Sequence, residues 1–183
     1  MSLPSRLARL DEAPLADKLR QAEALLPWAR AEWAAAGSGL AGLAELADHL
    51  TALAQVMTDL GLPGLCAACG SRPGGGCCSA EMGEAADVIL LLLNRLLGAE
   101  IRLAPGADGG CPFLAAGGCR LLVKPVFCLG YNCGAIHARL APTGWARLDQ
   151  ATGPVQSCQY RLEQEILGCL RSAGAFVKLG GST

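Results

Sequence analysis

Apolar residues recur at helical spacing through the clearest stretch of the chain. From residue 38 to 61 they return every three or four positions, at Leu40, Leu43, Leu46, Leu50, Leu53, Met57 and Leu60. This spacing places them on one face of an amphipathic helix. Ser38 is a suitable N-cap, and Gly61 followed by Pro63 marks an end. The pattern therefore predicts a helix that begins at about Ser38 and ends before Gly61.

A weaker helical pattern precedes it, from Pro14 to Ala36. Pro27 lies inside this pattern, and a proline in a helix interior removes a hydrogen bond and clashes with the preceding turn. We expect either one bent helix or two short ones. Trp28 and Trp33 follow the proline and are expected to pack in the core and at its edge.

The stretch "GLCAACGSRPGGGCC" comes next, and it contains too many glycines to predict a helix. Ser79 can cap a third helix that runs to Gly98. This would place Cys77 and Cys78 at a helix N-terminus. Because unpaired N–H groups carry positive charge there, we expect the pKa of these two thiols to be lowered.

The remaining pattern is irregular from Ala104 to Leu148, where Gly and Pro turn signals dominate. A short strand is predicted at Arg120 to Val123. A last helix is predicted from about Pro154 to Ala173, with Gly174 as its stop.

Length and composition indicate one helical domain. The chain has 183 residues, only 4% of them aromatic, and Leu and Ala dominate. We expect a mainly α fold, a small helical bundle with a loop-rich cysteine-cluster segment and little or no β-structure. The single domain, 1–183, would comprise N-terminal helices (1–62), a cysteine-rich metal-binding segment that includes one helix (63–148) and a C-terminal helix (149–183).

Charge and hydropathy limit the kinds of partner that we expect and indicate the cellular compartment. The formal net charge is -1, and Lys and Arg are scattered, so we expect neither nucleic acid nor a membrane as a partner. The first twenty residues show no secretory signal. The strongest apolar run, Val88 to Leu93, is shorter than the roughly 20 residues of a membrane span. We therefore expect a cytoplasmic protein, in which clustered cysteines serve metals rather than disulfides.

Eight of the ten cysteines lie in the two Gly- and Pro-rich segments, at Cys66, Cys69, Cys77, Cys78, Cys111, Cys119, Cys128 and Cys133. The first two form a C-x-x-C pair, which lets two sulfurs reach one metal or cluster. The adjacent Cys77 and Cys78 point in different directions, which suits a cluster of several metal atoms or two neighbouring sites. The later segment lacks the second close pair of a zinc ribbon, and this favours iron–sulfur binding.

These motifs resemble those of a known family. "CAACG", then "CC", "CPFL", "GCRL" and "KPVFC" resemble the YkgJ-type cysteine-cluster proteins, which are proposed to chelate zinc or iron. The pattern is also similar to that of the flagellin lysine N-methylase family, where it implies an iron–sulfur cluster. We expect Phe127 and Tyr131 to shield such a site from water. By position, the resemblance implies metal binding at Cys66, Cys69, Cys77, Cys78, Cys111, Cys119 and Cys128, and Cys133 outside the pattern is the candidate eighth ligand.

The favoured function is therefore a protein that carries one or two iron–sulfur clusters, [4Fe–4S] above other types. It would serve electron transfer, cluster carriage or the support of a redox enzyme, with a redox or cluster-receiving protein as partner. The alternative is a zinc-binding structural or chelating module. We identify no catalytic motif, and the sequence indicates neither a substrate nor an oligomeric state.

The other cysteines and histidines have simpler interpretations. Cys158 and Cys169 are eleven residues apart in the last predicted helix and share a face, so both are expected to be buried core thiols. His49 is expected to be partly buried and hydrogen-bonded. His137 follows the cysteine segment, and imidazole can replace thiolate in zinc and some iron–sulfur sites, so it is a lesser candidate ligand.

Overall fold

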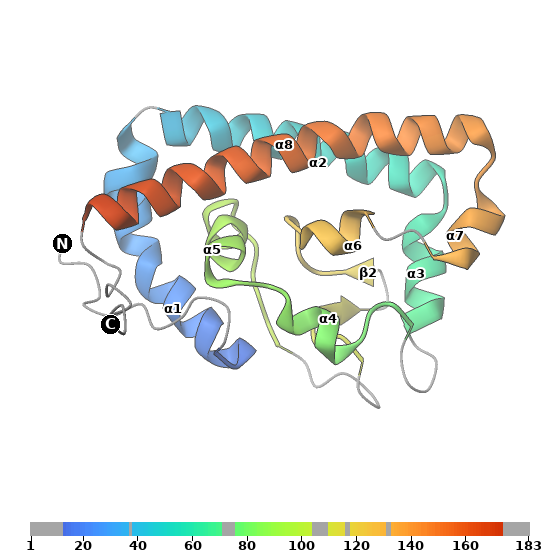
Figure 1. Cartoon of the computed structure of the whole chain (residues 1–183), viewed down its shortest axis with the longest axis horizontal. Helices are drawn as coiled ribbons and strands as arrows, with labels where there is room; N and C mark the ends of the chain where they lie inside the picture. Colours follow the sequence, from blue (N-terminus) through green and yellow to red (C-terminus); the bar gives the residue numbers. More distant parts are fainter. Residues whose placement is uncertain are drawn as a thin grey trace, which may run out of the picture.

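Two long helices form one side of the molecule. Helix α2 (Ser38–Asp59) and helix α8 (Pro142–Ser172) lie side by side, and the shorter elements gather beneath them (Figure 1). The expected mainly α fold is confirmed. The computed structural model describes residues 13–36, 38–70, 76–103, 110–115, 118–130 and 133–173.

The first helical stretch is continuous, but its hydrogen bonding changes after the proline. Helix α1 (Leu15–Trp28) passes into a π-helical segment, η1 (Ala29–Trp33), and then into a short 3-10 segment, η2 (Ala34–Ala36). Pro27 lies just before the change and provides no N–H for the regular ladder. Of the two expectations, one bent helix is the correct one, and both of its tryptophans are buried.

Helix α2 ends as its glycine predicts, but the next segment is a helix rather than a loop. Gly61 has a φ of 71°, and helix α3 (Leu62–Gly70) follows at once. Pro63 lies in its first turn, where a missing N–H costs nothing. The prediction that "CAAC" lies in a loop is therefore wrong, because the glycine run follows this helix instead of interrupting it.

The single helix predicted from Ser79 to Gly98 is also wrong, since two helices occupy this range. Ser79 does cap helix α4 (Ala80–Glu84), with its hydroxyl accepting the Met82 N–H at 3.2 Å. Asp87 then caps helix α5 (Val88–Leu96) by accepting the Leu90 N–H at 2.8 Å. Asp87 is extended, so the backbone cannot continue as one helix through it.

A small hairpin follows, and two short helices come after it. Strands β1 (Leu114–Ala115) and β2 (Gly118–Cys119) pair antiparallel, and helices α6 (Val126–Gly130) and α7 (Gly134–Arg139) follow. The strand predicted at 120–123 is not found there, because β2 ends at Cys119. The backbone N–H groups of Leu122 and Val123 instead bond to the side chain of the buried Asn94, as described below.

Helix α8 begins at Pro142 rather than at Pro154. Pro142 occupies its first turn, and Pro154 lies inside the helix on an exposed position. Gly42 allows α2 and α8 to approach each other closely, because a Cβ at this position would lie only 2.5 Å from the Leu162 Cδ2. The apolar stripe that holds α8 on the bundle continues through Pro154 and consists of Leu148, Val155, Leu162, Ile166 and Leu170.

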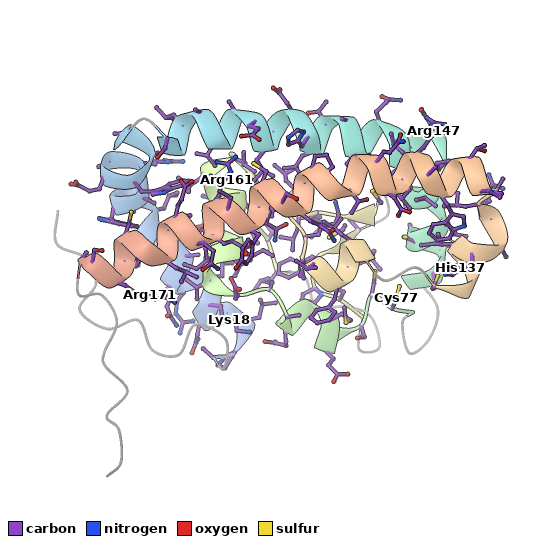
Figure 2. All side chains as sticks on the ribbon, turned by 45° about the horizontal axis from the view of Figure 1, so that its top comes forward. Lys18, Cys77, His137, Arg147, Arg161 and Arg171 are labelled. Carbon is purple, nitrogen blue, oxygen red and sulfur yellow. The ribbon has the colours of Figure 1, made fainter. Side chains whose placement is uncertain are left out.

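Two buried polar side chains join the bundle to the cysteine segments. The Lys18 Nζ, with its residue only 2% exposed, donates to the Glu84 carbonyl at the end of α4 at 2.6 Å (Figure 2). The fully buried Asn94 carboxamide accepts the N–H groups of Leu122 and Val123 at 2.8 and 3.1 Å. Its Nδ2 donates back to the Val123 carbonyl at 2.8 Å. Asn94 thus holds the backbone that leads into α6.

Within the described ranges, no single helix is long and apolar enough to cross a membrane. By length and composition alone, α2 and α3 pass that test only as a pair bent by 76°.

Replacing Asn94 by Leu is expected to destabilise the fold strongly. The substitution leaves the buried Val123 N–H and the partly buried Leu122 N–H without an acceptor, so the free energy of unfolding should fall by about 2–4 kcal/mol. Urea denaturation followed by circular dichroism measures this. The matched control is Gln164→Leu on the exposed side of α8, where a change within about 0.5 kcal/mol is expected. Equal effects of the two substitutions would contradict the role assigned to Asn94.

Candidate metal centre

A sulfur-lined cavity lies where α2, α3, α6 and α8 meet. Its volume is about 80 Å³, and four cysteines and two methionines contribute to its wall. The other wall residues are aliphatic except for one threonine, and the described lining contains no carboxylate or imidazole. The lining residues are Leu53, Met57, Leu62, Cys66, Cys77, Cys78, Met82, Cys128, Leu129, Ile136, Leu148 and Thr152.

Helix α3 forms the first part of the site. It carries Cys66 and Cys69 three residues apart, and residues at this spacing are neighbours on a helix surface. A Cβ at Gly76 would overlap the Cys69 Sγ, so only a glycine lets the following chain pass this close. The passage brings Cys77 next to the C-x-x-C helix.

The hairpin segment forms the second part. The Cys111 N–H donates to the Cys78 carbonyl at 2.9 Å, and the Leu114 N–H donates to the Cys111 carbonyl at 3.0 Å. Leu114 in turn pairs with Cys119 across the hairpin. A Cβ at Gly83 of α4 would lie 3.4 Å from the Cys111 Sγ, so α4 also packs closely here. Backbone hydrogen bonds thus connect Cys78 to the segment that carries Cys111 and Cys119.

The two short helices carry the last pair of candidate ligands. Cys128 lies on α6, and Cys133 is the N-cap residue of α7, which contacts α3. His137, four residues on, stacks its ring on Trp145 with the ring centroids 4.6 Å apart. Cys77 and His137 lie toward the same end of the molecule (Figure 2), but His137 is exposed and is not among the residues that line the cavity.

Burial keeps the thiols of the cavity protonated. Burial and the neighbouring Cys77 and Cys111 raise the pKa of Cys78 to about 12. Burial and the neighbouring Cys119 and Cys111 raise the pKa of Cys128 to about 11. An aliphatic pocket solvates a thiolate poorly, and several thiolates side by side repel one another. A metal that binds them must therefore displace protons.

The expectation that a helix N-terminus lowers the pKa of Cys77 and Cys78 is wrong. Burial raises the pKa of both thiols, and the charges of nearby cysteines add to it. Helix α4 has only five residues, so its dipole is short. Desolvation and repulsion between thiolates outweigh it.

All eight predicted ligand cysteines lie within electrostatic reach of at least one other member of the group. All ten cysteines of the chain are free thiols. In the part of the chain that the structure describes, however, no three His, Cys, Asp or Glu side chains converge closely enough to hold a metal ion. The donor chemistry fits a thiophilic metal, whereas the arrangement of the sulfurs is not that of a finished coordination sphere.

Met57 and Met82 are lining residues that the sequence analysis did not identify as part of the site. Met57 is a member of the apolar stripe of α2, and its periodicity alone points to the core. The composition could have drawn attention to these residues, because the chain has only three methionines. Their thioethers are soft, polarizable groups that can pack against, or bind, a thiophilic metal.

The expectations for the aromatic neighbours are not fulfilled. Phe127 is 73% exposed, so it does not shield the cavity. Its position on α6 directs it outward, whereas the next residue, Cys128, lines the cavity. Tyr131 lies outside the described residues. The shielding comes from leucine and isoleucine instead, including Leu53 and Ile136.

Of the two helical cysteines, one is in the core and the other is not. Cys158 is 3% exposed, and its Sγ lies 3.7 Å from the Gly42 carbonyl, so the core assignment is confirmed. Cys169 is exposed, and that assignment is wrong. Cys169 lines a surface hollow together with Trp33 and with Ser38, the first residue of α2, and its side chain stays open to solvent there. His49 is half-buried as expected, but its Nε2 lies 3.7 Å from the Glu45 Oε1, which is too far for the expected hydrogen bond.

In the metal-free protein, Cys78 and Cys128 are expected to resist alkylation near neutral pH. The ordinary thiol pKa is 9.0. Because the pKa of Cys128 is raised to about 11, it should carry roughly a hundredfold less thiolate at pH 8 than an ordinary thiol, and Cys78 should carry still less. Iodoacetamide labelling between pH 7 and pH 10, read by peptide mass spectrometry, tests this. The exposed Cys169 is the internal reference, and equal labelling rates for all three at pH 8 would contradict the burial of the thiols.

Comparison of the chain with protein-family models, with curated proteins and with solved structures finds no significant match. The resemblance to the YkgJ-type family therefore stays a prediction based on the cysteine motifs. The function proposed next is argued from the site itself.

Proposed function

We propose that the protein binds iron–sulfur clusters, one or two per chain and of the [4Fe–4S] type, through its two cysteine segments. One observation carries the proposal: four of the eight clustered free thiols line one cavity, whose described lining has sulfur donors but no carboxylate or imidazole. Cysteine thiolates are the usual ligands of such clusters. The proposed ligands are Cys66, Cys69, Cys77, Cys78, Cys111, Cys119, Cys128 and Cys133.

The surroundings of the thiols support a buried cluster. Leu53, Leu62 and Ile136 line the same cavity and restrict water. Solvent access and the hydrogen bonds to sulfur set the reduction potential of a cluster, so an aliphatic wall is suited to that purpose. When bound, the cluster would supply one-electron chemistry, and the chain would supply thiolates and exclude water.

A zinc-binding structural or chelating module is the second candidate. It is favoured by the number of thiols, because four thiolates complete a structural zinc site and this chain offers eight. In that case the metal would hold the hairpin, α3 and α6 together and would have no redox role.

The position of the site favours a protein partner over a small substrate. Cys119 is exposed, and Cys128, which lines the cavity, also reaches the surface of the molecule. Val126 and Phe127, next to Cys128 on α6, are 53% and 73% exposed. A redox or cluster-receiving protein could approach the site over this surface. We accordingly propose electron transfer, cluster carriage or support of a redox enzyme in the cytoplasm, and no catalytic residue.

Anaerobic purification followed by absorption spectroscopy and by iron, sulfide and zinc analysis tests the proposal. A brown protein with a broad band near about 400 nm and with acid-labile sulfide is expected. A colourless protein that contains zinc and no sulfide would contradict the iron–sulfur assignment and favour the second candidate. Cys158→Ala, which removes a core thiol outside the group of eight, is the control and should retain the full metal content.

A further inference from the structure

Both methionines in the part of the chain that the structure describes lie at the sulfur-lined cavity. Met57 of α2 and Met82 of α4 line it together with four cysteines, so half of the lining residues carry sulfur. Met1, the third methionine of the chain, lies outside the described residues. Iron–sulfur clusters are held by thiolates. The two thioethers are therefore sulfur donors that the proposed cluster does not use.

Packing alone does not account for these two methionines. Methionine is flexible and usually fills irregular gaps in a core. Here a cavity of about 80 Å³ remains beside two side chains that could close it. Met57 and Met82 are both half-buried, whereas the aliphatic wall residues Leu53 and Ile136 are only 2% and 6% exposed. Leucine and isoleucine thus build the buried wall, and the thioethers lie beside an unfilled space.

The backbone positions of both methionines are fixed by contacts elsewhere. The Met82 N–H donates to the Ser79 hydroxyl at the start of α4, at 3.2 Å. The next residue, Gly83, packs closely on Pro112, since a Cβ there would lie 2.7 Å from the proline Cδ. Met57 lies four residues after the buried Leu53, on the same face of α2. Two separate elements therefore bring a thioether to one cavity.

Charge determines which metal suits such a cavity. An aliphatic wall penalises a net charge, and a thioether is a neutral donor. One thiolate, two thioethers and a monovalent cation together carry no net charge. Four thiolates around Zn²⁺ would instead leave a charge of about -2. Thiolate and thioether ligands are typical of Cu(I), and the described lining offers no carboxylate or imidazole for a harder ion.

We propose that the cavity is a Cu(I) site, in which the thioethers of Met57 and Met82 bind the ion together with one thiolate from the four lining cysteines. The inference goes beyond the proposed function, because it assigns a second kind of metal and two further ligands. The thiol that becomes a ligand loses its proton to solvent, so binding of Cu(I) releases about one proton. No electron is transferred, because copper enters and stays as Cu(I). Since the lining cysteines are also proposed cluster ligands, Cu(I) and a cluster exclude each other here.

The Cu(I) affinity of methionine variants tests this site. The metal-free full chain is titrated anaerobically with Cu(I) in competition with bathocuproine disulfonate, a chelator whose colour reports the copper that it holds. Met57→Leu and Met82→Leu nearly conserve volume, and each removes one thioether. Loss of a residue that only supports a ligand already costs about 10–100-fold in metal affinity, so each substitution should weaken binding by at least about tenfold.

The matched control is Ile136→Leu, an isomeric change in the same wall, which should leave the Cu(I) affinity unchanged. Methionine variants that bind Cu(I) as tightly as the wild-type chain would overturn the proposal.

A second measurement needs no substitution in the site. The wild-type chain is prepared with selenomethionine, loaded with one equivalent of Cu(I) and studied by X-ray absorption at the copper edge. Two selenium neighbours and one sulfur neighbour of copper are expected. The labelled Met57→Leu/Met82→Leu chain, which keeps only Met1, should show no selenium neighbour. Copper with sulfur neighbours alone in the labelled wild-type chain would refute the role of the thioethers.

Cluster uptake by the same chains separates failure of this site from failure of the proposed function. Anaerobic reconstitution with ferrous iron and sulfide should give equal cluster content in the wild-type chain and in both methionine variants, because thiolates hold the cluster. A wild-type chain that takes up a cluster but binds Cu(I) no more tightly than the double variant overturns only the Cu(I) site. A chain that shows selenium neighbours of copper but takes up neither cluster nor zinc overturns only the proposed function.

A purely structural role of the methionines has its own signature. In that case the methionine variants would lose Cu(I) and the cluster alike, and copper in the labelled wild-type chain would have no selenium neighbour. This combination would also overturn the Cu(I) site.

Discussion

Ionising a thiol costs free energy when the thiol is surrounded by aliphatic side chains and by other thiols. Burial raises the pKa of Cys66, Cys77, Cys78, Cys111 and Cys128 alike, and the charges of neighbouring cysteines act in the same direction on all five. The cost disappears when a cation neutralises several thiolates together. The cysteine segments are therefore stable either as neutral thiols or as metal ligands, and unstable as free thiolates.

The helical frame, which consists of α1, α2, α5 and α8, does not depend on whether the thiols stay neutral or bind a metal. Helix α2 packs along α8, α1 packs on α5, and α5 also contacts α8, and these helices share one core of buried apolar side chains. Among the described residues, Asn94 bonds to the backbone before α6 and Lys18 to the end of α4, and these polar contacts connect the frame to the site. We infer that the frame folds by hydrophobic burial.

Sequence reasoning found the frame because its helices have long, regular apolar stripes. It failed where a local signal competed with tertiary packing. Pro154 resembled a helix start, although the stripe of α8 extends from Leu148 through it, and glycines near Cys66 resembled a loop although they follow α3. The extended backbone at Asp87 divides a helix that periodicity alone treats as one. For the site, the eight cysteines were identifiable from their clustering, but the contacts between the two segments were not. One of these contacts is a backbone hydrogen bond between Cys111 and Cys78, which are far apart in the sequence.

The uncovered end of α8 has a practical consequence for work with the purified protein. Cys169 is exposed in the last turn of α8, outside both cysteine segments. Exposed thiols join in air through intermolecular disulfides. Covalent dimers on a non-reducing gel that disappear on replacing Cys169 would thus record oxidation during handling, and the native state of assembly is to be measured with that residue replaced.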